Sequence, residues 1–285
     1  MKHLILFVFL FISQTAAAYI PPYWMIMSKT SDNHGTGLYL IEQDVIFETA
    51  AEPLILTERW IIANETSMRL EVIGRRQLKE VPRLTFIYQN NRRYYVDENG
   101  VKKFTKISDD FFEPYFHYRL SKNIKPLLVA MNIAPSISLK SDSHKYSTKN
   151  PQPPSEPYVR LSRTGGVITY AIGTPTPASS TEGYPGLWIE QDQFVIRRLR
   201  LPTQLEIVAN DYKTFANGLK LPQERLINWK TYSAKINLSS VKSISATKAV
   251  KESLDHSSLK FGENPNLSLR LTNDEVIKNF YSYLR

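Results

Sequence analysis

The chain has no cysteine among its 285 residues, and this absence excludes several kinds of site. Disulfide frameworks, thiolate zinc sites, iron–sulfur clusters and thiol nucleophiles all require that residue. Glycine is also scarce, with 11 residues, which excludes a fibrous glycine repeat. The hydrophobic content of 42% is too high for an intrinsically disordered chain. The sequence therefore describes a globular protein that can bury one large core or two modest ones.

Long apolar runs are missing as well, except at the start of the chain. The run Leu4–Ile12 follows the basic residue Lys2 and precedes the small residues Ala16–Ala18. This order is typical of a secretory signal peptide, and the run is shorter than the roughly 20 residues that cross a bilayer. We therefore expect residues 1–18 to be removed by cleavage after Ala18, which would leave an exported, periplasmic protein.

The net charge of +9 would fall to +8 when the signal peptide is removed, because Lys2 is lost with it. Nucleic acid is not an expected partner outside the cytoplasm, whereas anionic lipid headgroups or acidic glycans are. Several arginines stand side by side on expected strands, where neighbours point to opposite faces. Solvated sheet faces explain them best, and membrane-surface contact is the alternative for Arg75-Arg76, Arg92-Arg93 and Arg197-Arg198 with Arg200.

Hydrophobic periodicity predicts two series of strands with helices between and after them. The first series covers residues 38–49, 53–63, 66–74, 83–89, 92–97 and 101–106. The second covers residues 158–162, 166–173, 186–191, 195–201, 204–210, 224–230 and 232–244. Helices are expected at 21–31, 109–117 and 121–132, and after a capping box at 272–275. This order predicts an α+β protein with one antiparallel sheet, curled or barrel-like, and a few helices against one face.

The same pattern divides the chain into regions. After the signal peptide, residues 19–245 form a single curved-sheet domain, interrupted by a polar, proline-rich loop at 141–157. Residues 246–285 form a C-terminal extension that ends in a helix.

Catalytic and metal-binding patterns do not stand out. The histidines left in the mature chain are scattered, without metal-ligand spacing, and no nucleophile motif is present. The densest acidic cluster is Asp109, Asp110 and Glu113, at the start of an expected helix, where capping explains acids better than acid–base catalysis. The sequence therefore predicts no enzyme, no metal and no cofactor.

Aromatic residues are abundant, with four tryptophans, 16 tyrosines and 13 phenylalanines, and many fall on expected strands. Such residues fill an ordinary core equally well or line an apolar cavity inside a curled sheet. Periodicity alone leaves both interpretations open.

One stretch resembles a known group of proteins. Residues 185–190 (PGLWIE) lead to 194–198 (FVIRR), 208–212 (VANDY), 218–222 (GLKLP) and Arg225. This succession resembles the LolA/LolB-like outer-membrane lipoprotein-sorting and lipoprotein-carrier superfamily. Residues 40–45 (LIEQDV) with 58–60 (ERW) are compatible with the opening hairpin of that group. The resemblance implies a half-open β-barrel, strongly curved and antiparallel, whose apolar concave face is covered by helices and holds acyl chains.

The resemblance also implies which side chains meet a ligand. The apolar candidates on alternating strand faces are Trp60, Met68, Leu70, Phe86 and Trp188. The helix at 121–132 is the lid candidate, through Ile124, Leu127, Leu128 and Met131. The resemblance implies a periplasmic carrier for lipoprotein acyl chains or another lipid. A regulatory or protein-interaction module of the envelope with the same fold, and without transport, is the alternative.

Overall fold

A computed structural model describes residues 20–48, 52–75, 84–97, 99–139, 156–260 and 275–285. The expected signal peptide and its cleavage site lie outside these residues, as does nearly all of the loop expected at 141–157. No helix in the described part of the chain is long and apolar enough to cross a membrane.

The described residues form one antiparallel sheet of 13 strands, ordered β6-β5-β4-β3-β2-β1-β13-β12-β11-β10-β9-β8-β7. The first half consists of β1 (Leu38–Phe47), β2 (Leu54–Asn64), β3 (Ser67–Gly74), β4 (Leu84–Gln89), β5 (Arg92–Val96) and β6 (Lys102–Lys106). The second half consists of β7 (Val159–Thr164), β8 (Val167–Ile172), β9 (Gly186–Glu190), β10 (Ile196–Arg200), β11 (Glu206–Thr214), β12 (Lys220–Trp229) and β13 (Tyr232–Ile244).

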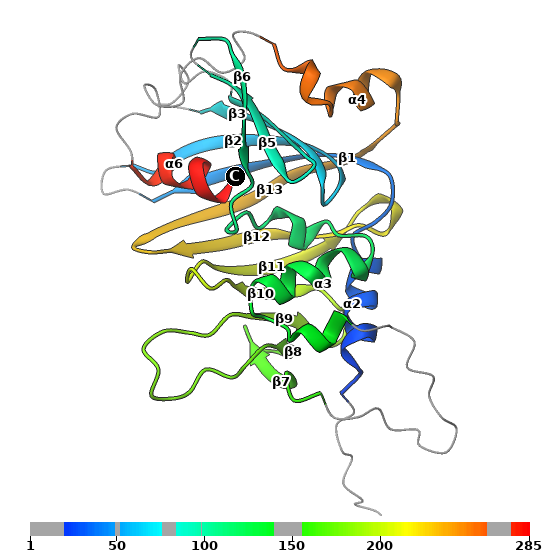
Figure 1. Cartoon of the computed structure of the whole chain (residues 1–285), viewed down its shortest axis with the longest axis vertical. Helices are drawn as coiled ribbons and strands as arrows, with labels where there is room; N and C mark the ends of the chain where they lie inside the picture. The colour runs from blue at the N-terminus through cyan, green and yellow to red at the C-terminus, as the bar shows by residue number, and fades with distance from the viewer. Residues whose placement is uncertain (1–19, 49–51, 76–83, 98, 140–155, 261–274) are drawn as a thin grey trace, which may run out of the picture.

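The first strand, β1, and the last strand, β13, lie side by side at the centre of the sheet. The chain runs outward from β1 to the edge strand β6, crosses to the opposite edge at β7, and comes back to β13, which pairs with β1 (Figure 1). Their pairing joins Leu38 to Ile244 and shifts by a bulge between Glu42 and Gln43. Because β6 and β7 lie at opposite ends of the strand order, the sheet curves without closing.

Helices cover the concave face of this sheet. They are α2 (Tyr23–Asp32), the 3-10 helix η2 (Glu113–Phe116), α3 (Ser121–Ala130) and the 3-10 helix η3 (Ser136–Leu139). In Figure 1, α3 and the segment before it lie in front of β10 to β12. The predicted α+β fold with a curved antiparallel sheet and helices on its concave face is therefore confirmed.

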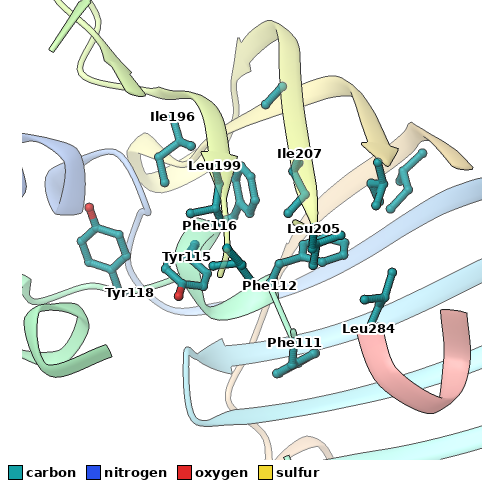
Figure 2. Close-up of a cluster of buried hydrophobic side chains, with 14 of the residues drawn as sticks. Phe111, Phe112, Tyr115, Phe116, Tyr118, Ile196, Leu199, Leu205, Ile207 and Leu284 are labelled. Atoms are coloured by element: carbon teal, nitrogen blue, oxygen red, sulfur yellow. The ribbon is translucent and has the colours of Figure 1, made fainter. Parts of the chain in front are cut away.

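The helix expected over 109–117 is the element that differs most. Only Glu113–Phe116 is helical, as one 3-10 turn with Pro114 in its first turn. The surrounding aromatic side chains explain this, because Phe111, Phe112, Tyr115 and Phe116 are all buried. Figure 2 shows Phe112 and Phe116 close to Leu199 and Leu205, whereas Phe111 lies apart from them and stacks on Tyr88 of the first half of the sheet. Packing on several sides favours an irregular segment over a regular helix with one apolar stripe.

The C-terminal region contacts both faces of the first half of the sheet. On the outer face lie α4 (Lys248–Ser253) and the 3-10 turn η5 (His256–Ser258), and Arg69 of β3 bonds to the Ser253 carbonyl. On the concave face lie α6 (Glu275–Asn279) and the π-helical turn η6 (Phe280–Leu284), drawn in red in Figure 1. The apolar side chains of α6 and η6 belong to the same core as the sheet, namely Val276, Ile277, Phe280, Tyr281 and Leu284.

Candidate functional site

The concave face of β2 to β4 carries a stack of aromatic rings. Trp60 lies over Tyr88 with ring centroids 5.7 Å apart, and Tyr88 lies over Phe111 at 4.5 Å, with their planes 4° from parallel. All three side chains are buried. Strand alternation explains the arrangement, because every second residue of β2, β3 and β4 faces the helices. This part of the concave face is therefore mainly aromatic.

Charged and polar groups share this face with the aromatic rings, because Glu58 lies two residues before Trp60 on the same strand. The Glu58 carboxylate accepts hydrogen bonds from Gln43 Nε2 at 2.6 Å and from Trp60 Nε1 at 3.0 Å. It also accepts one from Arg285 Nε at 2.8 Å, and both charged side chains are 0% exposed. The partners are 227 positions apart in the sequence. This pair therefore joins the C-terminal helical segment to the centre of β2.

A second buried pair lies beside the first. Arg225 of β12 donates through Nη1 to Glu113 at 3.0 Å and through Nη2 to Gln43 Oε1 at 2.7 Å. Arg285 Nη1 lies 3.3 Å from the Glu113 carboxylate, so the two pairs are continuous. Burial disfavours the charged carboxylate, but Arg225 and Arg285 outweigh it and hold the pKa of Glu113 far below its usual range.

These groups form a buried cluster that we call the ion cluster: Gln43, Glu58, Glu113, His117, Arg225 and Arg285. Burial lowers the pKa of His117 despite its contact with Glu113, so this histidine is neutral at pH 7. Two glutamates then balance two arginines. A buried pair of this kind adds little net stability, but removing one partner leaves a bare charge in the core. The cluster therefore fixes which segments meet at the concave face.

The structure brings four of the five predicted ligand-contacting residues together. Trp60, Met68, Leu70 and Phe86 are buried in one core on the concave face. Trp188 lies elsewhere, because its neighbours Leu187 and Ile189 face that core and alternation directs Trp188 outward. There it packs under the guanidinium groups of Arg198 and Arg200, 4.9 and 5.9 Å from the ring centroid. Contact of any of the five with a ligand stays a prediction.

Three of the predicted lid residues lie on α3, which covers the concave face, and Met131 directly follows that helix. Ile124, Leu128 and Met131 are buried in the core, and Leu127 packs against it half-buried. Their placement puts α3 over the sheet, and its movement as a lid stays a prediction.

The protein's own side chains fill the space at the concave face around the ion cluster. The pocket lined by Trp60, Glu113, His117, Arg225 and neighbouring apolar residues has a volume of about 10 Å³. This is room for about one water molecule and none for an acyl chain. An acyl ligand at this place therefore needs a covering segment to move.

Sequence reasoning missed the ion cluster. It treated Glu113 as a helix-capping acid together with Asp109 and Asp110, but the Glu113 carboxylate meets Arg225 and Arg285 in the core. Asp109, by contrast, is exposed and near Lys106. The single available signal was that Glu113 stands among four aromatic residues, which indicates burial. No pattern in the sequence links it to partners on β12 and at residue 285.

The arginines at 93, 197, 198 and 200 differ in their partners. Arg197 contacts Glu190 at 2.5 Å, and Arg198 and Arg200 contact Glu206 at 2.6 and 2.5 Å. These partners agree with the interpretation as sheet-face charges. Arg93 differs, because it points to the concave face and donates to the Tyr281 carbonyl at 2.8 Å.

His34, which follows α2, is buried and predicts a pH dependence of stability. Burial lowers its pKa to about 3, and a contact of 2.6 Å between Nδ1 and the Tyr118 carbonyl opposes this only in part. Between pH 6.5 and 3 the unfolded state binds a proton here that the folded state does not, so acidification favours unfolding. From pH 7 to pH 5 we expect His34 to cause a loss on the order of 2 kcal/mol. The lowered pKa of His117 is expected to add a loss in the same direction.

Urea unfolding of wild type and of His34→Gln at both pH values measures this effect. The variant is expected to lose about 2 kcal/mol less than wild type over the interval. An equal loss in the two proteins would show that His34 is not the group responsible.

No group of three or more histidine and acidic side chains is arranged to hold a metal ion within the described ranges.

Comparison with known proteins identifies the fold. No protein-family model matches the sequence, and no curated protein matches it. Among solved structures, a LolA superfamily protein from Nitrosomonas europaea aligns at a TM-score of 0.50 and 7% identity, over 81% of this chain and 97% of that one. A putative outer membrane lipoprotein-sorting protein domain from Vibrio parahaemolyticus aligns at 0.46 and 10% identity, over 79% and 93%. The chain therefore has a LolA-like fold, as its sequence pattern implies.

Proposed function

We propose that this chain is an exported carrier that binds the acyl chains of a lipid or lipoprotein against the concave face of its sheet. The observation that carries the proposal is the apolar surface formed by Trp60, Met68, Leu70 and Phe86 on neighbouring strands. Short helical segments cover this surface, rather than a second sheet, so it can be uncovered without breaking strand pairing. The LolA-like fold supports the same interpretation.

The energetics of acyl binding fit such a surface. Each methylene removed from water contributes about 0.8 kcal/mol, so a chain of about 15 methylenes contributes roughly 12 kcal/mol before costs. The covering side chains of residues 275–285 contribute about 1.5–3 kcal/mol each by the same rule. Summed over the five apolar side chains of that segment, this is roughly 8–15 kcal/mol, which is similar to the contribution of the acyl chain. Similar contributions are the condition for a ligand to exchange with a covering segment. No catalytic group is required by this function.

Titration of the mature protein with a fluorescent C18 fatty acid tests the proposal. We expect saturable binding of one probe per protein, with displacement by unlabelled fatty acid and by a diacylated peptide. High salt is expected to leave the affinity nearly unchanged, because the driving force is apolar. Absence of saturable binding would overturn the proposal.

A second candidate is an envelope regulatory or protein-interaction module without transport. The filled concave face favours it, because the pocket beside Trp60 holds only about 10 Å³. Under this alternative the probe does not bind, and a stable protein partner is recovered from the envelope instead. The titration therefore separates the two candidates.

A further inference from the structure

The C-terminal helical segment, residues 275–285, lies where an acyl chain would have to lie on the concave face. Phe280 of η6 contacts Phe47 of β1 with ring centroids 5.2 Å apart, and Trp229 of β12 at 5.6 Å. Phe280, Tyr281 and Leu284 are each at most 1% exposed. The segment therefore covers the seam between the two halves of the sheet with its apolar side.

The end of this segment is held in a site shaped for a guanidinium group. The carboxylate of Glu58 meets Arg285 Nε, and that of Glu113 meets Nη1. Aromatic rings face the cation from two sides, because its central carbon lies 4.5 Å from the ring centroid of Phe112 and 5.5 Å from that of Trp60. Carboxylates with aromatic faces suit the planar, charged guanidinium. We call Glu58, Glu113, Trp60 and Phe112 the guanidinium site.

A second arginine holds the same segment from the sheet. Arg93 of β5 donates through Nη1 to the carbonyls of Tyr281 and Ser282, at 2.8 and 3.3 Å, and to that of Arg285. A cation at the last carbonyls of a helical segment is favourable because those carbonyls lack helical partners. The segment is thus fixed by one arginine of its own and by one from the sheet.

Several features of this attachment are less favourable than those of a regular buried helix. The turn Phe280–Leu284 is π-helical, a geometry that is rare and unfavourable without support from its surroundings. Arg285 Nη2 is buried and has no hydrogen-bond partner among the described residues. The site therefore forms only part of the hydrogen bonds that the guanidinium group can donate. Tyr283 on the other side is 53% exposed. The segment is therefore a short amphipathic cover held at a few points.

We propose that residues 275–285 form a displaceable plug, locked by Arg285 in the guanidinium site, and that an acyl ligand enters the concave face when the plug leaves. This inference rests on the proposed function and adds how access to that site is controlled. Weakening the lock without changing the apolar surface is then expected to raise the affinity for acyl chains.

The double variant Glu58→Gln with Arg285→Gln removes both charges of the lock and keeps a polar side chain at each position. The matched control is Glu42→Gln with Arg59→Gln, an exposed pair 3.6 Å apart that joins β1 and β2. The first measurement is amide hydrogen exchange of residues 275–285 without ligand. We expect exchange to become at least about 10-fold faster in the double variant and to be unchanged in the control.

The second measurement is the dissociation constant of the fluorescent C18 fatty acid for the same proteins. We expect about 5- to 10-fold tighter binding in the double variant, because a larger fraction of molecules has the plug released. If the double variant fails to fold, Arg93→Gln replaces it, since it frees the carbonyl end of the plug and leaves the guanidinium site intact. The same two changes are then expected, in the same direction.

The outcomes separate the inference from the function on which it rests. Faster exchange with unchanged or weaker acyl binding overturns the plug and leaves the carrier function in place. Unchanged amide hydrogen exchange of residues 275–285 in the double variant would show that the pair Glu58–Arg285 does not hold this segment in place. Absence of acyl binding in wild type and in every variant overturns the carrier function itself, and with it the role of the plug in access.

Discussion

Replacing Glu113 by alanine is expected to lower the free energy of unfolding by about 3–5 kcal/mol. The glutamate is 1% exposed and meets both Arg225 and Arg285. Without its carboxylate, two guanidinium groups share the core with Glu58 as the remaining acid. An uncompensated buried charge costs far more than a lost surface contact. Urea or thermal unfolding of the purified variant measures the change.

Asp109→Asn is the matched control, because it alters an acid from the same short stretch of sequence. Asp109 is 66% exposed and lies 3.8 Å from Lys106, so its loss is expected to change stability by less than about 0.5 kcal/mol. Equal effects of the two substitutions would contradict the buried ion cluster.

Replacing Phe112 by alanine is expected to cost about 3–5 kcal/mol as well, through loss of apolar contact and the cavity left behind. Phe112 is 0% exposed and carries the guanidinium groups of Arg285 and Arg225 against its ring, at 4.5 and 5.6 Å. Its removal therefore weakens the aromatic core and the guanidinium site together. The midpoint of chemical unfolding reports the loss.

The control for this substitution is Phe104→Ala on the edge strand β6. Phe104 also meets an arginine, Arg92, at 4.3 Å from its ring, but it is 55% exposed. We expect a cost below about 1 kcal/mol, because little apolar area leaves the core. A larger loss at Phe104 than at Phe112 would mean that the concave face is not the main core.

Local patterns in the sequence predict most of the fold. Alternation of apolar residues is the direct consequence of a half-buried strand, and it locates β1 and β13 within three residues of their observed ends. The order of the elements predicts one curled antiparallel sheet with helices against one face, and the resemblance to the LolA/LolB-like group implies that this face is the concave one. The helix expected over 109–117 fails because its aromatic residues pack on several sides, which helical periodicity does not describe.

The candidate site is harder to predict from the sequence than the fold. Burial of Trp60, Met68, Leu70 and Phe86 on one face follows from the strand pattern, and the outward position of Trp188 follows equally from its place between Leu187 and Ile189. The partners of Glu58 do not follow, because Arg285 lies 227 positions away and pairs with it only once the sheet has formed. Charged residues are expected at the surface, so single-sequence reasoning places these on the wrong side.

The buried charges also bear on how the apolar side chains of the concave face are kept covered. An open apolar surface on a soluble protein invites association, and a covering segment of the same chain prevents it. Arg285 gives that segment one defined position, because its guanidinium fits a single site between Glu58 and Glu113. A covering segment with apolar contacts alone would not be held in one defined position.

The central claim, that acyl chains bind to the concave face, is tested most directly by contact quenching of tryptophan. Four tryptophans are present, and Trp60 and Trp188 lie on opposite faces of the sheet. One variant retains only Trp60 (W24F, W188F and W229F), and its counterpart retains only Trp188 (W24F, W60F and W229F). Each is titrated with dibrominated stearic acid, whose bromine atoms quench fluorescence at contact. We predict saturable quenching of Trp60 and none of Trp188, whereas quenching of Trp188 alone, or of neither, would contradict the account.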